Sequence, residues 1–88
     1  MPRTKPAPTQ FSRFRLDFAP MARRRRYLGM SQAQLARAIG VHPITQNRTE
    51  RNRSEPTFSQ VLAISRALGA PMHLLFDVVD LPALPHDG

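Results

Sequence analysis

Few side chains in this sequence could perform acid–base catalysis or bind a metal ion. Between residues 18 and 76 the only carboxylates are Glu50 and Glu55, and no serine, histidine and aspartate have the spacing of a nucleophilic triad. The three histidines, His42, His73 and His86, match no metal-ligand pattern, and there is no cysteine to assist them. No glycine-rich phosphate-binding loop is present. We therefore expect a protein that is not an enzyme and that has neither a metal site nor a cofactor.

Basic side chains, most of them arginines, outnumber acidic ones in this sequence. Thirteen Lys and Arg residues against 6 Asp and Glu residues give a net charge of +7. Residues 1–17 carry a net charge of +3, residues 18–76 of +7 and residues 77–88 of −3, so most of the excess lies in the middle of the chain. Such an excess indicates a polyanionic partner: DNA, RNA or an acidic membrane. Since it belongs to the middle of the chain, it can form a defined surface.

The ends of the chain differ in composition from this middle. Prolines make Met1–Gln10 unsuitable for helix, and it has too little apolar surface to order itself. Phe11–Phe18 fits either an extended arm or an edge strand, since Pro20 disfavours helix just before it. We expect a flexible basic arm over residues 1–17, one folded domain over residues 18–77, and a C-terminal tail over residues 78–88. Prolines in the tail predict that it frays, leaving it available for a dimer or partner contact.

No apolar stretch approaches the roughly 20 residues that would span a bilayer. The N-terminus also lacks the apolar core of a signal peptide. With no cysteine to form disulfides, the composition fits a reducing compartment. We therefore expect a cytoplasmic protein without a membrane partner.

Capping residues and glycines divide the domain into short helical segments. Ser31 and Gln34 have the spacing of a capping box, Thr57 is a second N-cap, and Pro43 suits a first helical position. Asn52–Pro56 is expected to be a loop. The five predicted segments are residues 19–29, 31–40, 43–51, 57–69 and 72–76. The sequence thus predicts an all-α fold, a compact bundle of about five short helices.

Apolar residues recur at helical spacing along these segments, and we expect them to form the core. Arg25 shares the inward face of the first segment. The predicted core residues are Met21, Ala22, Leu28, Leu35, Ala36, Ile39, Phe58, Val61, Leu62, Ile64, Leu68, Met72 and Leu75.

The second and third segments are joined only by Gly40-Val41-His42. Two helices joined by a three- or four-residue turn containing glycine form a helix-turn-helix unit, whose second helix enters the major groove of DNA. The unit needs a small residue where the helices approach, here Ala36, and a glycine able to turn left-handed, here Gly40. An apolar residue after the turn, Val41, completes it.

Three stretches of the sequence resemble the Cro/repressor, or XRE, family. Residues 29–41, G-M-S-Q-A-Q-L-A-R-A-I-G-V, are similar to its motif G-x-S-Q-x-x-L-A-x-x-x-G-V. Residues 50–56 resemble its E-x-G-x-x-x-P loop, and Ala67–Gly69 with Leu75-Phe76 resemble its closing segment. The resemblance spans roughly residues 19–76. It implies a lambda-repressor-like domain that binds double-stranded DNA.

The resemblance also implies a role for individual residues. Gln32 would contact a backbone phosphate and support the recognition helix, while Arg25 and Glu50 would form a structural ion pair. Apart from the resemblance, the position of His42 in the turn fits either a contact with a base or a polar cap of the third helix, of which we favour the cap. The residues that would face base edges are Pro43, Ile44, Thr45, Asn47 and Arg48. The residues that would lie beside the phosphate backbone are Arg51, Asn52 and Arg53.

The third segment departs from the family at three positions. Gln46 and Thr49 stand where large aliphatic residues are usual, and Asn52 replaces a glycine. A buried amide without partners costs about 1–3 kcal/mol. Either Gln46 has hydrogen bonds within the domain, or the third helix is rotated or shortened. Outside this segment, we expect Arg24 and Arg26 to add nonspecific affinity for DNA.

Three functions are compatible with these features. The first is a transcriptional repressor that binds an inverted repeat as a homodimer, through either Phe11–Phe18 or the apolar residues from Phe76 to Leu81. The second is an antitoxin-type protein whose tails bind a toxin while its domain represses its own operon. The third, a nonspecific RNA or nucleoid binder, rests on charge alone, and the regular helix-turn-helix spacing argues against it.

Overall fold

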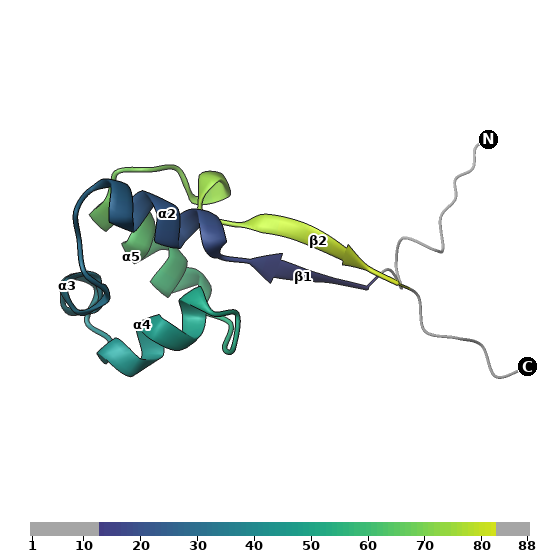
Figure 1. Cartoon of the computed structure of the whole chain (residues 1–88), viewed down its shortest axis with the longest axis horizontal. Helices are drawn as coiled ribbons and strands as arrows, with labels where there is room; N and C mark the ends of the chain where they lie inside the picture. The colour runs from purple at the N-terminus through teal and green to yellow at the C-terminus, as the bar shows by residue number, and fades with distance from the viewer. Residues whose placement is uncertain (1–12, 83–88) are drawn as a thin grey trace, which may run out of the picture.

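The computed structural model describes residues 13–82, which form four α-helices, a short 3-10 helix and a two-stranded antiparallel sheet. Figure 1 shows the helices packed together, with the two strands projecting from them. In chain order the elements are β1 (Arg13–Asp17), α2 (Ala19–Tyr27), α3 (Gln32–Ile39), α4 (Pro43–Glu50), α5 (Phe58–Leu68), η1 (Met72–Leu74) and β2 (Asp77–Leu81). None of these helices is long and apolar enough to cross a membrane.

Side chains close the first turn of each helix of the helix-turn-helix region. The predicted capping box of Ser31 with Gln34 begins α3, and the predicted N-cap Thr57 begins α5, where Gln60 completes a second capping box. At α4, Pro43 occupies the first turn and His42 Nδ1 accepts the N–H of Ile44 at 3.0 Å. These contacts satisfy N–H groups that a helix start otherwise leaves unpaired.

The turn between α3 and α4 has the predicted conformation. Gly40 is left-handed, with φ at 78°, and the N–H of Val41 donates to the carbonyl of Ala36 at 2.9 Å. A Cβ at Gly40 would meet nothing within 4 Å, so the turn needs glycine for its backbone angle and not for space. Ala36 is fully buried at the approach of the two helices.

The core lies between the four α-helices and η1. Its buried apolar side chains are Phe18, Met21, Leu35, Val61, Ile64, Leu68 and Leu75. Two predicted core residues are wrong, because Leu28 is 42% exposed and Phe58 is 71% exposed. Leu28 caps the C-terminal end of α2 and Phe58 is the first residue of α5, and helical periodicity does not fix the direction of a side chain where a helix ends.

The segment predicted as a fifth helix, Met72–Phe76, is shorter than expected. Only Met72–Leu74 is helical, and its hydrogen bonds span three residues: Leu74 N–H to the Pro71 carbonyl and Leu75 N–H to the Met72 carbonyl. The all-α, repressor-like fold is thus confirmed, with four α-helices and one 3-10 turn in the described chain in place of five helices.

The two strands, which we call the terminal ribbon (β1 and β2), correct the prediction for the chain ends. Of the alternatives for Phe11–Phe18, the strand is confirmed over Arg13–Asp17, so the flexible arm expected over residues 1–17 does not extend through it. The prediction that the tail frays is wrong over 78–81, which pair with β1 in a register from Arg13↔Leu81 to Asp17↔Asp77. Each strand finds its partner at the opposite end of the sequence, which local patterns do not reveal. The rest of the predicted arm and tail lies outside the described residues.

Candidate nucleic-acid interface

Helix α4 has an outward face and a buried face. Ile44 is 58% exposed and Arg48 is exposed, and Pro43 at the N-terminal end of the helix is exposed too. Gln46 and Thr49 are buried on the opposite side, at 1% and 4% exposure. The helix is therefore neither rotated nor shortened to expose Gln46, and its outward face keeps residues that can contact another molecule.

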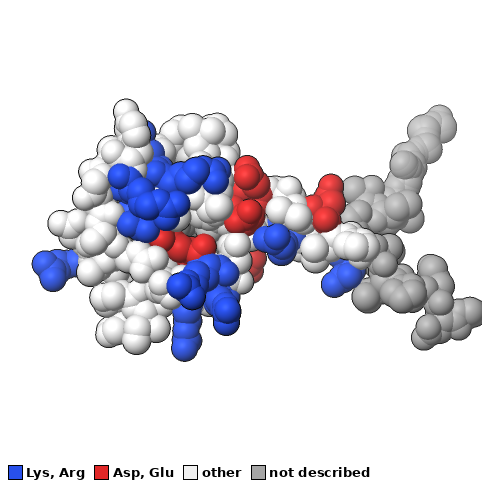
Figure 2. Space-filling model, in the orientation of Figure 1, with Lys and Arg blue, Asp and Glu red and all other residues white. Residues whose placement is uncertain are grey.

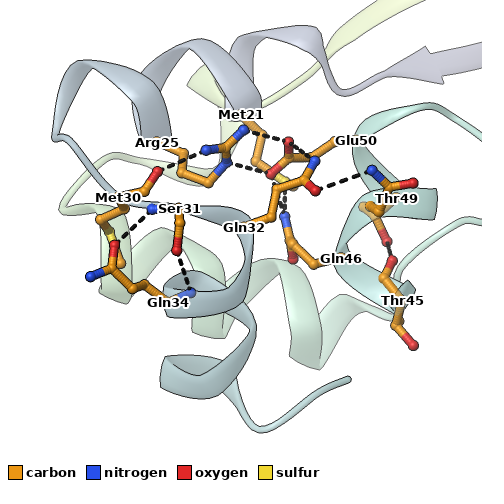
Figure 3. A network of polar contacts seen from close by, with 11 residues as sticks. Met21, Arg25, Met30, Ser31, Gln32, Gln34, Thr45, Gln46, Thr49 and Glu50 are labelled. Atoms are coloured by element: carbon orange, nitrogen blue, oxygen red, sulfur yellow. Dashed lines mark hydrogen bonds and ion pairs between the residues drawn. The ribbon is translucent and has the colours of Figure 1, made fainter. Parts of the chain in front are cut away.

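Gln46 is accommodated by the carboxylate of Glu50, which it reaches from one turn earlier on α4 (Figure 3). Gln46 Nε2 donates to Glu50 Oε2 at 2.8 Å and lies 3.5 Å from the sulfur of Met21. Of the two alternatives for Gln46, hydrogen bonding within the domain is confirmed. The polar residue thus completes an ionic network where relatives would place an aliphatic side chain.

The carboxylate of Glu50 accepts four hydrogen bonds. Arg25 donates from Nε to Oε2 at 2.8 Å and from Nη2 to Oε1 at 2.9 Å. Gln32 Nε2 donates to Oε1 at 2.9 Å, and Gln46 supplies the fourth bond. Each oxygen therefore accepts two donors, which satisfies a buried carboxylate. Arg25 also donates from Nη1 to the Met30 carbonyl at 2.7 Å, so it ties α2 to both α4 and the start of α3.

This ion pair is shielded from solvent, with side-chain exposures of 8% for Arg25 and 4% for Glu50. Burial raises the pKa of Glu50, but the hydrogen bonds from Arg25, Gln32 and Gln46 outweigh burial and hold that pKa below its ordinary value. Glu50 is thus an anion inside the domain, and removing either member of the pair would strand a buried charge.

Gln32 connects this network to the outward side of α4. Its Nε2 donates to Glu50, and its Oε1 accepts from Asn47 Nδ2 at 3.1 Å. Gln32 therefore contacts two residues of α4, Glu50 and Asn47, and supports this helix from α3. The Asn47 side chain is half-buried and held in one orientation by this contact.

Thr45 differs from the other residues expected to face bases. It is half-buried and lines the seam where α4 packs against α3 and α5, together with Ile39, Gln60 and Ile64. Its carbonyl accepts the hydroxyl of Thr49 at 3.0 Å, which satisfies the buried Thr49. The structure brings Ile44 and Arg48 onto the outward face and leaves Thr45 at its edge.

Asn52, the second residue after α4, is tied to the terminal ribbon. Asn52 has φ at 61°, the left-handed conformation in which its relatives place glycine. Its Oδ1 accepts the N–H of Phe18 at 2.9 Å, and its Nδ2 donates to Asp17 Oδ1 at 3.0 Å. We call these two bonds the Asn52 latch. Its side chain thus holds β1 and the start of α2, while the neighbouring Arg51 and Arg53 are exposed.

Asp17 is a structural residue beside the interface that was not predicted from the sequence. Besides the bond from Asn52, its Oδ1 accepts the N–H of Ala19 at 3.0 Å, at the start of α2. These two bonds, in that order of importance, hold the pKa of Asp17 below its ordinary value. An aspartate just before a predicted helix start is a capping signal that could have been used, although nothing in the sequence indicates its contact with Asn52.

Basic side chains gather around the helix-turn-helix unit. Figure 2 shows Lys and Arg atoms over α2 and around the C-terminal end of α4, with acidic atoms between the two groups. Arg24 donates from Nε to the carbonyl of Leu68 at 3.1 Å, at the C-terminal end of α5, and lies 5.5 Å from the ring of Tyr27. Arg26 is exposed, and the nonspecific affinity expected of both arginines stays a prediction.

A helix-turn-helix family model matches residues 21–75, which run from the third residue of α2 through η1 and include the whole polar network. The chain belongs to this family, in its XRE repressor branch. It is accordingly a DNA-binding regulator of the helix-turn-helix type.

Solved structures of regulators share this fold. The P22 c2 repressor, solved with a synthetic operator, is 32% identical with a TM-score of 0.62, over 65% of this chain and 86% of that one. The clp gene regulator ClgR from Corynebacterium glutamicum is 29% identical with a TM-score of 0.61, over 62% of this chain and 58% of that one. This chain thus corresponds to little more than half of ClgR.

A third similar structure reaches beyond the helical region. The hypothetical transcription factor NHTF from Neisseria is 25% identical with a TM-score of 0.60, over 85% of this chain and 82% of that one. Its match is longer than residues 21–75. No curated protein sequence matches the chain significantly.

Proposed function

We propose that this protein is a sequence-specific transcriptional repressor that inserts α4 into the major groove of double-stranded DNA and binds an inverted repeat as a homodimer. The observation that carries the proposal is the fixed outward face of α4. That face is presented by a helix whose other side is anchored through the buried Glu50 carboxylate. An anchored helix keeps its side chains in one register along the groove, which base recognition requires.

Base recognition would rest on the N-terminal and central part of α4. Arg48 can donate two hydrogen bonds to a guanine, and Asn47 can pair with an adenine, each contributing about 1–3 kcal/mol of discrimination. Because Asn47 is held by Gln32, its amide is already oriented before DNA binds. Ile44 and Pro43 would make apolar contacts, for which the methyl group of thymine is the natural partner in the groove. Thr45, at the edge of this face, contributes least.

Phosphate contacts would set the position of the protein on the duplex. Arg51 and Arg53 are exposed next to the end of α4 and would bind backbone phosphates. Asn52 would act through its left-handed backbone and the Asn52 latch, which place these two arginines. Gln32 would reach a phosphate with the N–H that its bond to Glu50 leaves over, and His42 acts as the N-cap of α4.

A homodimer matches an inverted repeat because two-fold symmetry in the protein mirrors that of the operator. The two α4 helices would then lie in successive major grooves about 34 Å apart on one side of the duplex.

Selection of bound sequences from a library of random duplexes tests this function. We expect enrichment of one motif with two inverted halves, and an affinity for it at least a thousandfold above that for bulk DNA, as specific binders show. The variant Arg48→Ala should lose the motif, while the matched control Arg66→Ala, an exposed arginine on α5, should retain it. Uniform affinity for all duplexes with a steep salt dependence would contradict the proposal and support a nonspecific binder.

An antitoxin-type function is the second candidate, favoured by the exposed apolar side chains of the terminal ribbon. Phe14 and Val78 are each 59% exposed. If this function holds, the protein expressed at its native level should co-purify with the product of a neighbouring gene in fixed stoichiometry. Purification as a pure homo-oligomer that binds its operator would contradict it.

A further inference from the structure

The terminal ribbon presents one apolar face, and among residues 13–82 its two strands pair only with each other. Residues paired across the strands share a face, so Phe14, Leu16 and Val78 lie on one side together with Asp80. Leu16 packs against the core, whereas Phe14 and Val78 remain exposed. Within the described chain, β1 is in extensive contact only with β2. Its outer edge, which we call the β1 edge, is therefore open to another strand.

Charge on the ribbon favours a protein over DNA as the occupant of this edge. The ribbon carries two arginines, Arg13 and Arg15, against three aspartates, Asp17, Asp77 and Asp80. A surface with both signs and a slight excess of acid repels phosphates, unlike the arginine-rich surroundings of α4. Figure 2 shows these acidic and basic atoms interspersed along the ribbon.

The β1 edge is complementary to itself. When two copies of β1 pair antiparallel about a two-fold axis at Arg15, Phe14 of each copy lies opposite Leu16 of the other, and Arg13 lies opposite Asp17. Arg15 faces Arg15 of the second copy at the axis, a like-charge pair that is unfavourable by itself. Asp17 of the second copy lies diagonally next to each Arg15 and offsets this repulsion. Arg13 uses Nη1 for the Pro82 carbonyl at 3.0 Å and retains its other N–H groups for a partner.

The edge of β2 lacks this complementarity. An antiparallel pairing about Val79 would place Asp80 opposite Val78 and Asp77 opposite Leu81. Both acids would then face apolar side chains, and β2 of the second copy would supply no basic residue to either. Charge therefore selects the β1 edge over the β2 edge for a symmetric contact.

Space beside β1 suits a second strand and its side chains. A hollow of about 210 Å³ lies at the root of β1, lined in part by Arg15, Asn52 and Glu55. On the apolar side, a groove of about 350 Å³ is lined by Leu16 together with Phe18, Pro56, Phe58, Val61, Met72 and Phe76 and by Glu55 at its rim. Because Phe14 of the second copy lies opposite Leu16 and on the same face, its ring would lie next to this groove.

We infer that the β1 edge is the dimer interface: two copies pair β1 with β1 into a four-stranded sheet, and Phe14 of each copy covers the apolar groove of the other. This inference rests on the proposed function, because it supplies the homodimer that an inverted repeat requires. The Asn52 latch joins β1 to the second residue after α4, so the sheet also sets how the two recognition helices lie relative to each other.

A single-cysteine crosslink tests this register, since the natural chain has no cysteine. At the two-fold axis the two Arg15 Cα atoms lie about 4.5–5.5 Å apart, within the range of a disulfide. Arg15→Cys should therefore form a disulfide-linked dimer under mild oxidation. The control Val79→Cys, on the same face but three strand spacings or about 14 Å from its copy, should remain uncrosslinked. Crosslinking of Val79→Cys and not of Arg15→Cys would overturn the inference.

Analytical ultracentrifugation of the full chain measures the dimer itself. The natural protein should sediment as a dimer, and Phe14→Glu should weaken dimerisation at least tenfold, because it places a carboxylate in the apolar groove. Since Phe14 is exposed, this variant should keep its helical circular dichroism and its preference for a half-site. A monomeric natural protein that still selects one DNA motif would refute the interface and leave the DNA-binding function standing. A dimer without sequence preference would refute only the function.

Discussion

The helical body and the terminal ribbon are held together by different forces. In the body, α2 to η1 bury a continuous apolar core and a carboxylate with four hydrogen bonds. The ribbon has only two strands, which are marginal alone, and it is fixed at its root by Leu16 and the Asn52 latch. The family match covers the body and stops short of both strands. Helix α4 is thus anchored within the body, whereas the terminal ribbon is held only at the end where it joins the body.

Removing the anion at the centre of the body should have the largest effect. Glu50→Ala leaves Arg25 buried without its partner and should lower the free energy of unfolding by about 3–5 kcal/mol, measured by urea denaturation. Because a domain this small could unfold altogether, a triple variant serves as control: Arg25→Met, Glu50→Leu and Gln46→Leu, the last because Gln46 would otherwise lose its buried acceptor. It should be within about 2 kcal/mol of the natural protein. A loss below about 1 kcal/mol for Glu50→Ala would mean that the network is not an anchor.

Substitutions at Asn52 distinguish the stability of the ribbon from that of the body. Asn52→Ala loses the latch and also strains a left-handed backbone, so it should destabilise the protein by about 1–2 kcal/mol more than Asn52→Gly does. Asn52→Gly should leave the body intact but speed amide hydrogen exchange in β1 and β2. Unchanged exchange in the ribbon would show that the Asn52 latch does not hold it.

Acid should weaken the body through Glu50 and the ribbon root through Asp17. Both carboxylates have pKa values below the ordinary ones in the folded protein, so the unfolded chain binds protons more readily. Stability is therefore complete above the ordinary Glu value of 4.5 and is lost as the pH falls through the lower folded pKa. Urea midpoints measured between neutral pH and pH 3 should fall in this window, and Asp17→Asn should make the fall shallower. A midpoint that rises on acidification would contradict the assigned pKa directions.

The distal ribbon should contribute least to stability. Phe14→Ala removes an exposed side chain and should change the free energy of unfolding by less than about 0.5 kcal/mol when thermal denaturation is followed on dilute, monomeric protein. A loss comparable to that of a core substitution such as Leu35→Ala would show that the ribbon belongs to the core.

Most of the body could be predicted from the sequence because its signals are local. Capping residues, the left-handed Gly40 and apolar periodicity locate α2 to α5 to within a residue or two. The resemblance to the family supplied the pairing of Arg25 with Glu50, since residues so far apart leave no local trace of their contact.

What the sequence could not predict depends on contacts between distant segments. In the sequence, Gln46 is only a departure from the family pattern. The structure shows its purpose, because its amide donates the fourth hydrogen bond to the buried Glu50 carboxylate. Asn52 looks like a phosphate contact and a glycine substitute, yet its side chain faces Asp17 and Phe18. The strand at Asp77–Leu81 is stable only beside β1, from the other end of the chain. Each of these features depends on which residues the fold brings into contact, and local sequence patterns do not contain that information.

The central claim, that the outward face of α4 reads bases while the arginines after it hold the backbone, is tested most directly by two variants on one DNA. Affinities of the natural protein, Arg48→Ala and Arg53→Ala would be measured for the selected motif and for each of its single-base substitutions. We expect Arg48→Ala to lose discrimination at one base pair, by about 1–3 kcal/mol, and Arg53→Ala to weaken binding to all sequences alike with a shallower salt dependence. An equal, sequence-independent loss in both variants would contradict the assignment of the recognition face.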